Sequence, residues 1–146
     1  MIMLNEMMKI AIEVAQKSTS DIPCGALIVR GDEIIAKCSN EREKQNRIIA
    51  HAEILAIDFA NKKLNSKYLT DCDMYVTLEP CPMCAWAIIN SRIKNLYFGA
   101  HDIKYGAFGG AINLKNLSNS KINVYSGIME DECQNILNNY FRGLRK

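Results

Sequence analysis

Two short strings of residues in this chain combine side chains that can bind a metal ion with one that can move a proton. The first, His-Ala-Glu, spans residues 51–53, and the second, Pro-Cys-Pro-Met-Cys, spans residues 80–84. Because Cys81 and Cys84 are three residues apart, one helical turn would place both sulfurs on the same side, where they can hold one ion. Imidazole and thiolate are typical zinc ligands, so the spacing predicts that His51, Cys81 and Cys84 bind one Zn²⁺.

The number of candidate ligands indicates a catalytic zinc site. Structural zinc usually has four protein ligands, whereas catalytic zinc has three and keeps one position for water. Two thiolates cancel the formal charge of the ion and weaken its acidity, so we expect a nearby base to help deprotonate the water. Glu53 lies two residues from His51. It can take the proton and return it to a leaving group, and we predict that Glu53 is the catalytic base and acid.

Hydrophobic periodicity and turn residues predict the elements that would position these side chains. In chain order they predict a helix over residues 4–15, strands over 25–30 and 33–37, a helix over 50–60, a strand over 73–78, a helix over 81–90, strands over 95–98 and 122–125, and a helix over 129–141. Strands that alternate with helices through short connections indicate parallel crossovers. We therefore predict an α/β fold, with one three-layer α/β/α domain over residues 1–146 and a mixed, roughly five-stranded sheet.

Length, charge and cysteine content narrow the class of protein. A chain of 146 residues with 49% hydrophobic content can bury one core. The net charge of +2 permits an RNA partner without requiring one. No apolar run reaches the length of a membrane span and the N-terminus lacks the pattern of an export signal, so we expect a cytoplasmic protein with no membrane partner. In that compartment the six cysteines favour metal ligands or reduced thiols over disulfides.

Two other interpretations of the Cys-x-x-Cys pair have less support. A structural zinc knuckle with another cysteine as fourth ligand leaves Glu53 without a role. A thioredoxin-like redox motif does not need a distant His-x-Glu string. His101 follows a predicted strand, but a lone histidine there receives no role. The remaining cysteines are more typical of small buried apolar side chains, and we assign no chemistry to Cys24, Cys38, Cys72 and Cys133.

The order His-x-Glu and then Pro-Cys-x-x-Cys is typical of zinc-dependent nucleobase deaminases. The chain resembles the bacterial tRNA-specific adenosine deaminases over nearly its whole length. The stretches that carry the resemblance are residues 22–26, Asn40, and residues 50–54, 75–84, 91–93, 98–102, 104–107 and 127–142. The last of these, the C-terminal tail, is the part least expected of other deaminases.

This resemblance implies a cytidine-deaminase-like fold, one Zn²⁺ per subunit, and a homodimer that binds a tRNA anticodon loop across both subunits. It implies hydrolytic conversion of adenosine to inosine at the wobble position, by zinc-activated water with Glu53 as the proton shuttle. It also places Asn40 against the flipped base and Asp102 near the nucleotide. Phe141 and Arg142 would lie beside the anticodon, where an aromatic or guanidinium group can stack on splayed bases.

Two departures from the family pattern bear on the substrate. Residues 47–49 are Arg-Ile-Ile where the family usually has an Asp-Pro-Thr-like stretch, and Trp86 stands where a small residue is common. One alternative is therefore a deaminase of a free base or nucleoside such as guanine, cytosine or cytidine, against which the tail at residues 140–142 argues. Another is a noncatalytic RNA-binding module with structural zinc, against which the presence of Glu53 beside three candidate ligands argues.

Overall fold

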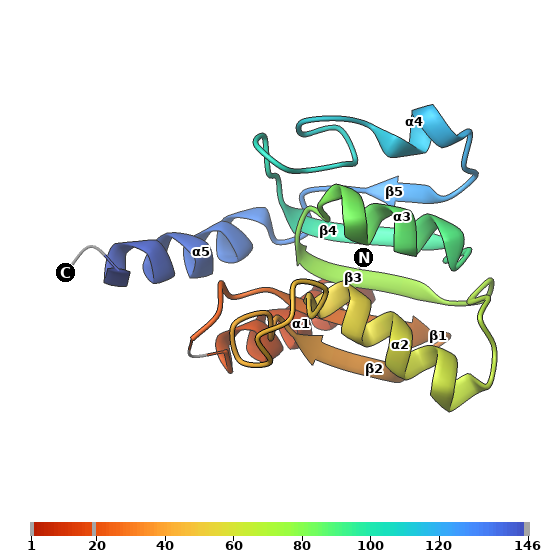
Figure 1. Cartoon of the computed structure of the whole chain (residues 1–146), viewed down its shortest axis with the longest axis horizontal. Helices are drawn as coiled ribbons and strands as arrows, with labels where there is room; N and C mark the ends of the chain where they lie inside the picture. Colours follow the sequence, from red (N-terminus) through yellow and green to blue (C-terminus); the bar gives the residue numbers. More distant parts are fainter. Residues whose placement is uncertain (1, 19, 145–146) are drawn as a thin grey trace.

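The computed structural model describes residues 2–18 and 20–144. Its helices and strands follow one another in the alternating order that the sequence predicts (Figure 1). The elements are α1 (Ile2–Gln16), β1 (Gly25–Arg30), β2 (Glu33–Ser39), α2 (Ala52–Leu64), β3 (Asp73–Leu78), α3 (Pro82–Asn90), β4 (Asn95–Ala100), α4 (Leu114–Ser118), β5 (Asn123–Tyr125) and α5 (Glu130–Leu144).

The strands form a five-stranded mixed sheet in the order β2-β1-β3-β4-β5. β1 pairs antiparallel with both β2 and β3. β3, β4 and β5 are parallel, so their carboxyl ends lie at one edge of the sheet. The predicted mixed sheet and its parallel crossovers are confirmed.

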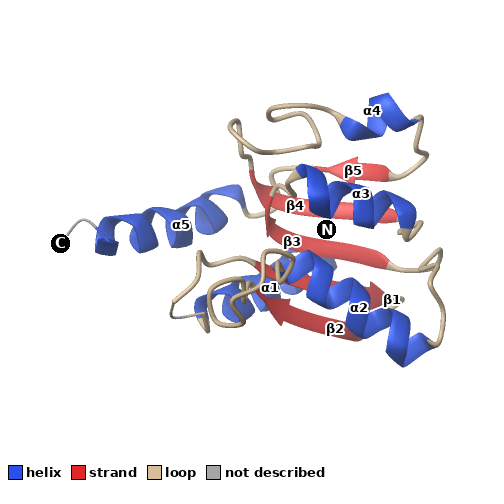
Figure 2. Ribbon diagram, viewed as in Figure 1, coloured by secondary structure: helices blue, strands red, loops and turns tan. Residues whose placement is uncertain are grey.

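Helices cover both faces of the sheet. Figures 1 and 2 show α2 and α3 in front of the sheet and α1 behind it. Because successive strand residues point to opposite faces, the interior strand β1 contributes side chains to two cores. Ala26 and Ile28 pack with residues of α2 and α3. Leu27 and Val29 pack with residues of α1 and α5, which explains the unbroken apolar run over residues 26–29. The α/β/α prediction is confirmed.

The sequence-based prediction missed one helix, α4, which lies between the strands predicted over 95–98 and 122–125. This helix has five residues, and of these only Leu114 is buried, so it has no apolar periodicity to detect. The side chain of Asn113 caps its start by accepting a hydrogen bond from the N–H of Asn116. Asn119, in the left-handed region at φ 54°, ends it. Local capping defines α4.

No helix within the described ranges has the length and apolar composition of a membrane span.

Gly99 allows α5 to pack closely on β4. A Cβ atom at this position would lie 2.8 Å from the Cβ of Cys133 on α5 and 3.0 Å from the backbone oxygen of Thr77. Since the backbone of β3 cannot move aside cheaply, we expect Gly99→Ala to lower the free energy of unfolding by about 1–3 kcal/mol, measured by urea denaturation.

The matched control is Gly143→Ala in α5, where an added Cβ meets no atom within 4 Å. This change is expected to raise the free energy of unfolding by about 0.5–1 kcal/mol, because alanine favours helix more than glycine does. Equal stability of the two variants would contradict the close packing of α5 on β4.

Candidate active site

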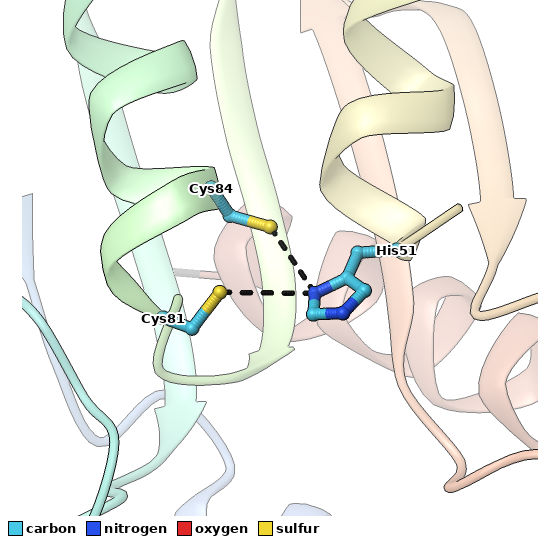
Figure 3. Close-up of side chains that lie close together, drawn as sticks. All are labelled: His51, Cys81 and Cys84. Carbon is cyan, nitrogen blue, oxygen red and sulfur yellow. Dashed lines mark hydrogen bonds between the residues drawn. The ribbon is translucent and has the colours of Figure 1, made fainter. Parts of the chain in front are cut away.

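The side chains of His51, Cys81 and Cys84 meet at the N-termini of α2 and α3 (Figure 3). His51 is the N-cap residue of α2 and Cys81 is the N-cap residue of α3. Pro82 occupies the first turn of α3, where its fixed φ angle favours the start of a helix. Both helices lie on the same face of the sheet and begin beyond the carboxyl end of β3, so residues far apart in the chain come together there.

The distances within this cluster fit a zinc ion. The Nδ1 atom of His51 lies 3.4 Å from the sulfur of Cys84 and 3.7 Å from the sulfur of Cys81. All three donor atoms lie within 4.8 Å of one another. Tetrahedral zinc, with sulfur at about 2.3 Å and nitrogen at about 2.0 Å, places nitrogen and sulfur ligands about 3.5 Å apart. None of the other four cysteines belongs to the cluster, so the closed four-ligand alternative lacks a fourth donor.

The electrostatic environment of the three side chains favours the binding of a cation. A hydrogen bond with Cys84 lowers the pKa of the Cys81 thiol to about 4 and raises the pKa of Cys84. A hydrogen bond with Cys81 in turn raises the pKa of His51. The positive ends of the helix dipoles also favour thiolate at these positions. The cysteine pair therefore carries negative charge at neutral pH, which favours binding of a divalent cation.

Glu53 lies in the first turn of α2 and is only 4% exposed. Burial raises the pKa of its carboxyl group to about 7. A group with a pKa near neutrality both accepts and returns a proton readily, as a general base that becomes a general acid must. The side chain lines the same cleft as the metal-binding cluster. Its proposed role as proton shuttle is thus compatible with its position, and remains a prediction.

A cleft of about 520 Å³ opens over the cluster, and Asn40 and Asp102 lie in its wall. The Nδ2 atom of Asn40 donates to the carbonyl of Ile22 at 3.1 Å, and its Oδ1 atom accepts from the N–H of Arg42 at 3.2 Å. These bonds orient the amide and leave one N–H and one lone pair for a substrate. Both residues thus occupy the cleft as the resemblance implied, and their contacts with a nucleotide remain predictions.

Phe141 and Arg142 lie outside the cleft. They are exposed residues of the last part of α5, which extends beyond the body of the molecule (Figure 1). The ring of Phe141 packs edge-on against Tyr140 at 5.3 Å. The structure does not bring these two residues to the metal cluster, and a role beside the anticodon remains a prediction.

Tyr105 and Arg42 also line the cleft, although sequence reasoning assigned neither of them a role. The sequence feature that could have identified Tyr105 is the stretch 104–107, which is part of the resemblance to the family. Of the two departures from the family pattern, only the first reaches the cleft. Ile48 lines it, whereas Trp86 is 44% exposed on the surface of α3 and does not.

The fold and the three-ligand site together define a zinc-dependent deaminase of the cytidine-deaminase-like class. A family model described as MafB19-like deaminase matches residues 2–145. The tRNA-specific adenosine deaminase of Bacillus subtilis is 46% identical over 143 residues, which cover 95% of this chain and 89% of that protein. That of Aquifex aeolicus is 38% identical, with 94% and 93% covered. The chain belongs to the tRNA-specific adenosine deaminase family.

Solved structures agree with this assignment. A structure from a study of A-to-I editing by tRNA:A34 deaminases matches with a TM-score of 0.84 and 38% identity, covering 90% of this chain and 99% of the other. The guanine deaminase of Nitrosomonas europaea matches with a TM-score of 0.80 and 25% identity, covering 93% and 83%. The predicted deaminase class, fold and zinc cofactor are thereby confirmed.

Proposed function

We propose that this enzyme converts adenosine to inosine at the wobble position of a tRNA anticodon. The observation that carries the proposal is a cleft in which a three-ligand metal cluster lies beside the buried carboxyl group of Glu53 and the oriented amide of Asn40. The names of the curated relatives and the similarity to a tRNA:A34 deaminase structure support adenosine in tRNA as the substrate. All of these residues lie on helices packed against one sheet or directly after one of its strands, which supports a single deaminase domain.

The residues of the cleft have separate roles in the proposed hydrolysis. His51, Cys81 and Cys84 would hold the zinc ion, which would supply a Lewis acid for the activation of water. Glu53 takes a proton from the attacking water and delivers it to the amino group, which leaves as ammonia. The N–H and lone pair that Asn40 has free can pair with the edge of the base. Each of these groups acts without moving far, because each is held at an element end or by backbone hydrogen bonds.

The size of the cleft supports a flipped nucleotide as the reacting unit. A volume of about 520 Å³ lies within the range of about 300–1,000 Å³ for small-ligand pockets. It can hold one nucleotide, whereas a folded stem-loop must stay outside. Nucleobase deaminases act on bases taken out of the stack, and anticodon-loop bases are already accessible for this.

The test is ammonia release by purified protein offered an anticodon stem-loop with adenosine at the wobble position. Free adenosine, cytidine, cytosine and guanine are offered in parallel. Turnover of the stem-loop with inosine at the wobble position is the expected result. Turnover confined to a free base or nucleoside would keep the zinc chemistry and overturn the proposed substrate. Guanine is the alternative with a specific observation behind it, namely the similarity to a guanine deaminase structure.

A homodimer and a cytoplasmic location belong to this proposal. A tRNA substrate supports the cytoplasm as the place of action. Large apolar side chains are exposed on each of the three helices on one face of the sheet: Phe59 on α2 is 53% exposed, Trp86 on α3 is 44% exposed, and Leu117 on α4 is 74% exposed. Exposed large apolar side chains favour a protein interface on this face.

Trp86→Glu is expected to convert the dimer to a monomer, because a carboxylate in the centre of an apolar interface cannot be buried without a partner. The measurement is size-exclusion chromatography with light scattering. Leu144→Glu is the control, since Leu144 is 66% exposed on α5, away from these helices. A parent protein that is monomeric, or a Trp86→Glu variant that remains dimeric, would contradict this interface.

A further inference from the structure

A buried carboxylate that the proposed mechanism does not use connects the metal-binding helix to one wall of the cleft. Glu79 follows β3, stands two residues before Cys81, and is only 2% exposed. Its Oε1 atom accepts a hydrogen bond from the N–H of Asp102 at 3.0 Å. Its Oε2 atom accepts from the N–H groups of Phe108 and Gly110, at 3.1 and 2.8 Å. One side chain thus holds three points of the segment between β4 and α4, which we call the cleft loop (residues 101–112).

The cleft loop is wound tightly around this carboxylate. A Cβ atom at Gly106 would overlap the carboxyl group of Glu79. One at Gly110 would overlap the backbone oxygen of Asp102 and lie 2.8 Å from Oε1 of Glu79. Two backbone bonds complete the winding: the N–H of Gly106 donates to the carbonyl of Asp102 at 2.8 Å, and the N–H of Ala107 donates to the carbonyl of Pro80 at 2.9 Å. Glycine is therefore required at both positions, because the loop approaches Glu79 and its own Asp102 backbone too closely for a Cβ atom.

The same loop carries two side chains that line the cleft, Asp102 and Tyr105. The Oδ1 atom of Asp102 accepts from the N–H groups of Lys104 and Tyr105, at 3.0 Å each. Asp102 therefore holds the local turn, while Glu79 holds Asp102. The position of this wall relative to the metal cluster depends on the bond between the Glu79 carboxylate and the N–H of Asp102.

We propose that Glu79 is a positioning residue, whose buried carboxylate sets the cleft loop, and with it Asp102 and Tyr105, at the distance from the metal-binding helix that the substrate requires. The inference rests on the proposed function, because it concerns the substrate wall of the same cleft. Glu79 also contributes to the lining of the cleft. Its carboxylate oxygens, however, are engaged by the backbone N–H groups of the loop, so we expect Glu79 to act through the loop.

The chemistry of the carboxylate makes one substitution especially informative. A carboxylate accepts hydrogen bonds at both oxygens, whereas a glutamine amide accepts at one end and donates at the other. In Glu79→Gln, the orientation that keeps the bonds from Phe108 and Gly110 turns the NH₂ group toward the N–H of Asp102. Two donors then face each other. The variant should therefore release the Asp102 end of the loop while the other end stays attached.

The first measurement is hydrogen exchange of the zinc-loaded protein without substrate. In Glu79→Gln the peptide over residues 101–106 is expected to exchange at least about tenfold faster, the equivalent of losing one such hydrogen bond. Peptides over α2 should be unchanged, and zinc content should remain that of the parent. Val29→Ala is the control for a general loss of stability. Val29 is 2% exposed, packs in the core on the other face, and pairs with Asp73 at the opposite edge of the sheet.

The second measurement is the division of the effect between KM and kcat, with whichever substrate the parent turns over. Glu79→Gln is expected to raise KM about tenfold and to change kcat per bound zinc by less than about threefold. The reason is that the cleft loop contributes to substrate binding, whereas the chemical step takes place at the metal-binding cluster. Val29→Ala should change neither. Gly110→Ala places a Cβ atom against the backbone oxygen of Asp102 and Oε1 of Glu79, so it should displace the same end of the loop and give the same division. It keeps the test available if Glu79→Gln does not fold.

Unchanged exchange of the cleft loop would overturn the proposal, as would faster exchange with unchanged KM, which would make Glu79 a purely structural residue. Zinc loss in Glu79→Gln would also overturn it, because the side chain would then support the metal helix instead of the loop. Failure of the proposed function is distinguishable, since it would show as a parent protein that does not deaminate the stem-loop, whereas the exchange measurement needs no substrate.

Discussion

Replacement of Glu53 by alanine is expected to lower turnover by about 100- to 10,000-fold, the range that general acid–base catalysis contributes, while the fold and the zinc remain. The reason is that Glu53 lies in the cleft beside the cluster without belonging to it. Removing its carboxyl group takes away the group that accepts and returns the proton, and leaves all three candidate ligands in place. Ammonia release per bound zinc is the measurement.

Two further variants sharpen this test. Glu53→Gln keeps the size of the buried side chain and removes only its ability to carry the proton, so it should lose as much activity as Glu53→Ala. Glu6→Ala, an exposed position on α1 behind the sheet, is the control and should retain normal turnover. Normal activity in Glu53→Ala would remove the proposed mechanism.

Replacement of Cys81 by serine is expected to abolish zinc binding at ordinary concentrations. The pKa of Cys81 is lowered to about 4 by its hydrogen bond with Cys84, so this sulfur is a ready anionic ligand. A serine hydroxyl stays protonated and leaves two ligands for the metal. Removing a residue that only supports a metal ligand typically lowers metal affinity about 10- to 100-fold. Removing a ligand itself should lower zinc affinity by more than this, and activity should fall with it.

Elemental analysis of zinc per chain and the unfolding temperature are the measurements, because metal binding contributes directly to the stability of the folded state. Cys38→Ser is the matched control: Cys38 is half-buried on β2 and does not belong to the cluster. Its zinc content should equal that of the parent. Unchanged zinc occupancy in Cys81→Ser would remove Cys81 from the ligand set.

The choice of substrate depends on features around the cleft rather than on the metal cluster. A guanine deaminase and a tRNA:A34 deaminase study both supply structures similar to this chain, with TM-scores of 0.80 and 0.84. We therefore expect discrimination between bases to come from the cleft wall and from surfaces beyond it. Ile48, Tyr105 and the exposed end of α5 are the parts of this chain where such discrimination can reside.

Sequence patterns predicted the longer elements well and their ends less well. α2 was predicted over residues 50–60 and is observed as Ala52–Leu64, which ends where Asn65 adopts the left-handed conformation. The predicted strand over 95–98 continues to Ala100, because pairing of β4 with β3 extends as far as Leu78 and Ala100. Element ends depend on caps and on pairing partners, which apolar periodicity does not report.

The sequence by itself determined the ligand types, the spacing of the cysteine pair and the alternation of strands and helices, because these follow from the backbone geometry of neighbouring residues. Only the tertiary structure placed His51 within 3.4 Å of Cys84, from which it is separated by 33 positions. That approach requires α2 and α3 to pack side by side on one face of the sheet with their N-termini at the same end. The same is true of Glu79, whose three donors lie 23 to 31 residues away. Contacts over such separations depend on how whole elements pack, which no local pattern specifies.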